Sequence, residues 1–413
     1  MSSPLTKPKS RTAQAFFIAL LMAVLLFLPF LIFDRGYFIY YGDFNVQQIP
    51  FYQMAHDAVR AGNFGWNWTT DLGANFIGSY SFYLLGSPFF WLTIPFPSEA
   101  VPYLMAPLLM LKLALASLFA HLYLRRFVKP DIALFAALLY AFSGFSFYNI
   151  FFNHFHEAIL YFPLMLLGME RLMADGKRGL FALAVFLSAI SNYYFFIGQA
   201  IFLIVYWILR CFSDDWRATF PKFLSVLLEA VAGTAMAAIL LAPSFFAVIQ
   251  NTRVDSPLLG WDALIYSTPQ RFYDILHSFF FPADIPARAN FFPDANNNWA
   301  SMSAWLPVFG CTGLMAYMQS RTHRDWLRRL LTFCLLCAFI PLLNAMFQLF
   351  NSMYYARWYY MMVMMIVLAT ALCFDRAADV PVNWKRAFGW CSGITAAFAL
   401  YIGLMPASLE PDA

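Results

Sequence analysis

Long apolar runs recur along nearly the whole chain, and they constrain the fold more than any other feature. Crossing about 30 Å of hydrocarbon takes roughly 20 residues of helix, and the first run, residues 16–33, is close to that length. Hydrophobic residues make up 62% of the 413 residues and charged residues only 12%, which excludes an ordinary soluble domain. The sequence therefore predicts an all-α integral membrane protein.

We expect about eleven transmembrane helices, together forming one transmembrane domain over residues 1–413. The expected spans cover residues 13–33, 101–124, 130–150, 157–173, 179–192, 194–210, 222–249, 304–319, 329–346, 358–374 and 388–405. Two of them are short and meet near Asn192, which predicts a helical hairpin. Residues 82–96 are broken by two prolines, so this stretch is predicted to be re-entrant or interfacial.

Most of the 26 Lys and Arg residues fall in alternate connections between these spans. The positive-inside rule assigns such connections to the cytoplasm, and with them the N-terminus. Residues 34–80 and 250–303 then form two long loops on the extracytoplasmic side of the membrane. Within the first loop, apolar residues at helical spacing predict a short amphipathic helix on the outer membrane surface.

Two carboxylates in the first loop are candidates for chemistry. Asp43 follows Gly42 shortly after the first span, where a general base would meet a substrate at headgroup depth. The alternative is an ordinary turn aspartate beside a glycine. Asp71 shares its loop with aromatic residues that could stack on sugar faces, and its alternative is a loop carboxylate within the interfacial aromatic belt.

A histidine-rich motif, residues 153–157, falls at the outer end of two adjacent spans. His154, His156 and Glu157 could hold a metal, but zinc needs a further ligand that the sequence does not identify. Hydrogen bonding to a substrate and simple interfacial polarity are the other interpretations. We expect no metal ion and no cofactor.

Three charged residues stand in or beside predicted spans. Lys112 and Glu229 lie inside spans, where an unpaired charge is costly, so they are expected to pair or to face water. Lys112 could instead bind an anionic group within a cavity. Arg357 stands at the outer end of a span among aromatic residues, where it either binds a phosphate through its guanidinium fork or anchors the helix at the interface.

These motifs, taken in order, resemble the YfhO family of bacterial membrane proteins, which looks like a branch of the GT-C glycosyltransferases. The resemblance rests on Gly42-Asp43-Phe44 with Gln47-Gln48-Ile49-Pro50, residues 68–76, 140–145, 153–157 and 191–196, and Arg357-Trp358-Tyr359. It covers nearly the whole chain. Members of that family are commonly longer, so the chain resembles a short version without the usual C-terminal part.

The resemblance implies a GT-C-like helix bundle that transfers a sugar from a polyprenyl-phosphate donor to a cell-envelope polymer or glycolipid outside the membrane. Asp43 matches the family's acidic position and would be the catalytic base of an inverting transfer. The implied substrate contacts are Arg357 and Lys112 for the phosphate, and Asp71, His154, His156 and Asn192 within the cavity. A partner enzyme that makes the lipid-linked donor is also implied, whereas nucleic acid is not.

Two other functions fit the same sequence. Charged residues within spans and broken helices also occur in transporters and lipid flippases, although the two halves of this chain show no obvious inverted repeat. A noncatalytic subunit of an envelope-assembly complex would retain the same scaffold.

Overall fold

The computed structural model describes residues 11–40, 42–70, 72–213, 216–249, 260–283, 298–308, 310–375 and 381–404. These residues are mainly helical, and the strands among them are two short antiparallel ones, β1 (Trp66–Asn67) and β2 (Ala74–Asn75). The register of this pair places Trp66 opposite Asn75. The expectation of an all-α membrane protein is confirmed.

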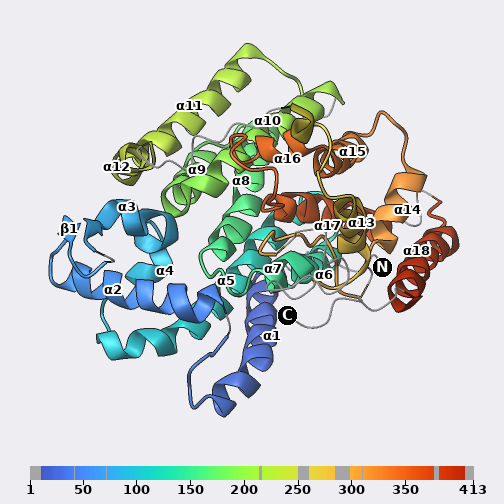
Figure 1. Ribbon diagram of the computed structural model, residues 1–413. Helices are drawn as coiled ribbons and strands as arrows, with labels where there is room; N and C mark the ends of the chain where they lie inside the picture. Colours follow the sequence, from blue (N-terminus) through green and yellow to red (C-terminus); the bar gives the residue numbers. More distant parts are fainter. Residues whose placement is uncertain are drawn as a thin grey trace, which may run out of the picture.

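The helices form one bundle in which α5 (Val101–Leu124) and α8 (Phe155–Asp175) lie centrally (Figure 1). The other helices of the first half are α1 (Thr12–Phe33), α2 (Ile49–Arg60), α3 (Phe76–Tyr80), α4 (Pro88–Trp91), α6 (Pro130–Ala141), α7 (Gly144–Tyr148), α9 (Leu180–Ser191) and α10 (Tyr193–Phe212). The second half contributes α11 (Phe220–Met236), α12 (Ala238–Val248), α13 (Gln270–Phe280), α14 (Thr312–Ser320), α15 (Trp326–Phe339), α16 (Pro341–Met346), α17 (Tyr359–Asp375) and α18 (Trp384–Leu404).

Small residues allow the central helices to approach closely. The buried positions of α1 include Ala15, Ala19 and Ala23, four residues apart, and α1 packs against α5. This is the small-residue spacing that brings transmembrane helices into contact. Between α8 and α9, a Cβ on Gly168 would lie 2.6 Å from Phe181 Cα, so only glycine permits this approach.

Five helices are long and apolar enough to cross a membrane, or six if a bent pair counts as one span, among the residues that the structure describes. They are α1, α5 with the preceding turn, α6 with α7, α10 and α18, and the bent pair is α11 with α12 at 74°. Both α1 and α18 expose large apolar side chains, as lipid-facing helices do.

By this criterion of length and apolar composition, fewer described helices qualify as full spans than the eleven predicted. Several of the predicted spans are shorter in the structure or broken. Residues 304–308 are not helical, and α14 begins only at Thr312, so the expected span 304–319 is wrong in its first half. The expected span 329–346 is interrupted at Ile340, which adopts an extended conformation before Pro341.

Other irregular segments agree with the expectations. The chain breaks between α9 and α10 at Asn192, whose side chain accepts a hydrogen bond from Phe195 N at 3.3 Å and so caps α10. Residues 82–96 form only short helical turns. The predicted amphipathic helix is α2, which buries Tyr52, Ala55 and His56.

We predict that chemical labelling can show on which side of the membrane two connections between the helices lie. A cysteine at exposed Asn63, at the end of α2, should react with a membrane-impermeant maleimide in intact cells, because this loop is expected to lie outside. One at exposed Thr322, in a basic connection, should react only after lysis. The wild-type chain is the control, since five of its six cysteines are buried and Cys211 is partly buried. The reverse pattern would invert the topology.

Candidate functional site

A polar cavity of about 380 Å³ brings together segments that are far apart in the sequence. We call it the Asp43 cavity, after the carboxylate on its wall. Its lining residues are Asp43, Gln47, Phe82, Tyr83, Phe152, His154, Phe155, Trp299, Tyr355 and Arg357. Three residues that the sequence singled out, Asp43, His154 and Arg357, therefore share one cavity.

Asp43 is presented by a tight turn. Gly42 has a φ of 67°, which favours glycine, and a Cβ there would lie 2.7 Å from Trp299 Cη2. The π-helical turn η1 (Phe44–Gln48) begins at the next residue, yet the Asp43 side chain does not cap it. The alternative of a structural turn aspartate receives no support, because the carboxylate makes no hydrogen bond to a described residue.

The electrostatics of Asp43 suit a proton acceptor. Partial burial raises the pKa of its carboxyl above the ordinary value, and the charge of Arg357 opposes that rise. No ion pair joins these two side chains among the described residues. The carboxylate thus keeps its lone pairs for a substrate while its pKa is raised toward the range of a useful general base.

Arg357 is held by aromatic rings. The guanidinium carbon lies 3.7 Å from the ring centroid of Tyr355 and 5.0 Å from that of Phe155. Its Nε is buried and has no hydrogen-bond partner among the described residues. A guanidinium stacked between aromatic rings on a cavity wall is suited to binding a phosphate.

His154 reaches the cavity from the start of α8. Its Nδ1 lies 3.0 Å from Gln48 Oε1, and Gln48 donates to Gln47 Oε1 at 3.2 Å. This arrangement places the imidazole proton on Nδ1 and leaves Nε2, buried and without a hydrogen-bond partner, as an acceptor. His154 can therefore accept a hydrogen bond from a substrate hydroxyl.

Of the other predicted site residues, His156, Asn192 and Lys112 do not line this cavity. His156 turns to the backbone oxygen of Ser146, at 3.1 Å from its Nε2. Asn192 donates to Phe82 O at 3.1 Å, so it supports a wall residue. Asp71 lies outside the described residues. Among those residues, no group of three His, Cys, Asp or Glu side chains could hold a metal ion.

Lys112 is fully buried beneath the histidine motif. Its Nζ forms an ion pair with Glu157 at 2.8 Å and donates to Asn153 O at 3.0 Å. The expected pairing of Lys112 with Glu229 is wrong. Glu229 instead accepts hydrogen bonds from Gly179 N at 2.9 Å and Ala182 N at 3.1 Å, where it satisfies backbone donors at the start of α9.

We predict that Lys112→Met strongly destabilises the protein. Removal of one partner leaves Glu157 buried and unpaired, which typically costs about 3 to 5 kcal/mol. The melting temperature of the purified protein should fall sharply, and the double variant Lys112→Met/Glu157→Met should recover most of the loss. Lys129→Met, at an exposed position, is the control. A melting temperature that Lys112→Met leaves unchanged would contradict a structural role for the pair.

Sequence reasoning missed part of the cavity. Gln47 and Gln48 belong to the motif Gln47-Gln48-Ile49-Pro50, but a pair of glutamines does not by itself predict a contact with His154. Trp299 carried no signal, since its place depends on how distant segments pack. Spacing alone could have suggested Tyr355, which is two residues before Arg357.

The comparisons with known proteins point to one family. The profile of a family described as "Bacterial membrane protein YfhO" matches residues 15–409, nearly the whole chain. The chain is also similar to a Bacillus subtilis (strain 168) protein named "Uncharacterized protein YfhO", with 24% identity over 239 residues. That alignment covers 51% of this chain and 27% of the relative.

Proposed function

Because the chain belongs to the YfhO family of bacterial membrane proteins, we propose that it is a membrane glycosyltransferase using a polyprenyl-phosphate sugar. The observation that carries the proposal is the Asp43 cavity, where a carboxylate without a hydrogen bond to a described residue, an arginine and an imidazole acceptor line one polar space. The acceptor would be a hydroxyl of a cell-envelope polymer or glycolipid. The site would face the outside of the cytoplasmic membrane, as the charge pattern predicts.

The proposed reaction is a single displacement. Asp43 takes the proton of the acceptor hydroxyl as the oxygen attacks the anomeric carbon. The bond between that carbon and the phosphate oxygen breaks, and polyprenyl phosphate leaves with the electron pair. One carboxylate suffices for this inverting step, since no covalent intermediate has to form.

The cavity residues fit separate parts of this substrate. Arg357 would bind the phosphate, whose negative charge grows as the bond breaks. The Nε2 of His154 would accept a hydrogen bond from a sugar hydroxyl. The ring of Trp299, packed against Gly42 on the cavity wall, would provide an apolar face for the sugar ring.

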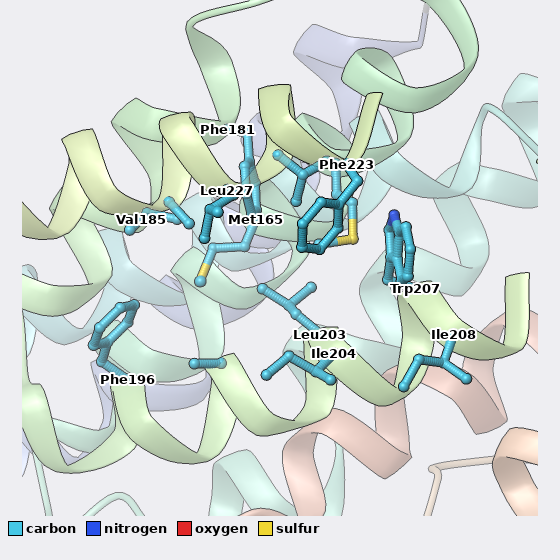
Figure 2. Close-up of a pocket in the computed structure, with 14 residues that line it drawn as sticks. Met165, Phe181, Val185, Phe196, Leu203, Ile204, Trp207, Ile208, Phe223 and Leu227 are labelled. Atoms are coloured by element: carbon cyan, nitrogen blue, oxygen red, sulfur yellow. The ribbon is translucent and has the colours of Figure 1, made fainter. Parts of the chain in front are cut away.

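An apolar pocket of about 480 Å³ supports a lipid-linked donor (Figure 2). It lies between helices α8, α9, α10 and α11 and is lined by apolar side chains and Trp207. Phe196 lines it only two residues after Tyr194, whose ring lies 5.6 Å from the Arg357 guanidinium. Ile204 and Leu227 are 59% and 44% exposed, so a prenyl chain could enter from the bilayer.

The proposal is tested by following label from a radioactive polyprenyl-phosphate sugar in membranes that contain the protein. A transferase moves the label from the lipid into an envelope fraction, and a panel of sugars identifies the donor. A flippase would carry intact donor across the bilayer without breaking the sugar–phosphate bond. A noncatalytic subunit would do neither, and either of these results would contradict the proposal.

A further inference from the structure

A second polar cavity lies at the other end of the same central helices. We call it the Arg321 cavity; its volume is about 390 Å³. Its lining residues are Arg126, Phe127, Glu170, Ala174, Arg210, Trp216, Tyr317, Arg321, Asp325, Trp326 and Leu372. Helix α8 begins at the Asp43 cavity with Phe155 and reaches the Arg321 cavity at Glu170, which is about 22 Å of helix.

The acidic side chains in and beside this cavity are already engaged. Glu170 pairs with Arg210 at 3.0 Å, and Asp175 receives two hydrogen bonds from Arg126, at 2.8 and 3.0 Å. Asp325 accepts hydrogen bonds from Tyr317 Oη at 2.9 Å and from its own helix at 2.8 Å. Glu170 and Asp175 are therefore paired with other arginines, and Asp325 forms no ion pair with Arg321 among the described residues.

Two buried donors on the cavity wall have no acceptor among the described residues. They are Arg321 Nε and Trp216 Nε1, and Trp216 as a whole is only 4% exposed. Arg321 forms no ion pair with a described residue, and its guanidinium lies 5.4 Å from the ring centroid of Tyr317. Buried donors are nearly always satisfied, so these two remain available to a ligand with acceptor oxygens.

The other residues that line the Arg321 cavity indicate the chemical class of that ligand. The cavity lining holds three arginines, two carboxylates and several aromatic rings, so its formal charge is positive, and it lies where α8 and α10 end. Basic pockets between membrane helices on the cytoplasmic side bind phosphate-bearing headgroups. A phosphate offers several acceptor oxygens to a guanidinium and an indole at once, which a hydroxyl cannot.

We propose that the Arg321 cavity is a binding site for a phosphate-bearing anion, whose oxygens accept hydrogen bonds from Arg321 Nε and Trp216 Nε1. The anion is either the headgroup of an anionic phospholipid or a water-soluble phosphate. The site is separate from the Asp43 cavity and does not depend on sugar transfer.

The test uses the purified full chain and two probes, short-chain dihexanoyl phosphatidylglycerol and inorganic phosphate, each titrated by calorimetry. We expect Arg321→Gln to weaken binding at least about tenfold, because it removes a charge-assisted hydrogen bond. Arg324→Gln, at an exposed position three residues away, is the matched control and should bind as the wild type does. Binding of the lipid alone identifies a headgroup site, and binding of inorganic phosphate identifies a site for soluble phosphates.

Trp216→Phe provides an independent variant if Arg321→Gln does not fold. It keeps an aromatic ring beside Arg210 but removes the indole donor, so affinity for the anion should fall. The proposal is overturned if neither probe binds the wild-type chain. It is also overturned if Trp216→Phe, together with Arg321→Gln where that variant folds, binds both probes with wild-type affinity.

Discussion

Asp43→Asn is expected to slow sugar transfer by about a hundredfold to ten-thousandfold, the usual contribution of a general base. The substitution keeps the size and polarity of the side chain but removes the proton acceptor. Because the Asp43 carboxylate makes no hydrogen bond to a described residue and caps no helix, the variant should fold and insert normally. The loss should therefore appear in kcat, with donor affinity close to wild type.

Two control variants make this result specific. Asp57→Asn removes a carboxylate on the nearby helix α2 whose side chain is 60% exposed and does not line the cavity. It should transfer sugar at the wild-type rate. Asp71→Asn tests the other candidate in the same loop, and wild-type turnover in Asp43→Asn with none in Asp71→Asn would move the base to Asp71.

Arg357→Lys is expected to weaken donor binding about tenfold to a hundredfold, which corresponds to one charge-assisted hydrogen bond. The charge is kept, but the planar fork that can hold two phosphate oxygens is lost. The stacking of the guanidinium on Tyr355, at 3.7 Å, also requires a planar group. Equilibrium binding of the polyprenyl-phosphate sugar to purified protein measures the effect.

The interfacial-anchor interpretation of Arg357 makes the opposite prediction. A lysine extends to the headgroup region as well as an arginine does, so an anchor would tolerate the exchange. Arg35→Lys, at an exposed arginine in the first predicted outer loop, should leave donor binding unchanged. Wild-type donor affinity in Arg357→Lys and also in Arg357→Ala would exclude the phosphate contact.

The helical framework could be predicted because a bilayer imposes length and composition directly on the sequence. The break before α10 followed from the polar residues around Asn192, and the short turns of residues 82–96 followed from their prolines. Breaks that depend on packing were less visible. The apolar stretch before Thr312 looks helical by composition, yet Val308 has a φ of 71° and the chain there is irregular.

The site was only partly predictable because local sequence does not show which side chains meet. Lys112 and Glu229 both lie inside expected spans, so Glu229 was the predicted partner of Lys112. Glu157 was assigned to a helix end, but α8 begins at Phe155 and is buried from its first turn, so Glu157 is the carboxylate within reach. The contact between Gly42 and Trp299 joins segments more than 250 residues apart, and no local pattern encodes it.

The most direct test of the central claim is the pH dependence of the sugar-transfer rate in wild type and Asp43→Asn. A base works only when deprotonated, so the wild-type rate should fall as the pH drops through the pKa of Asp43. Burial raises that pKa, so the decline should begin at a higher pH than for an ordinary aspartate. The residual activity of Asp43→Asn should lack this decline. The same acid-side decline in both proteins would contradict the assignment of Asp43 as the base.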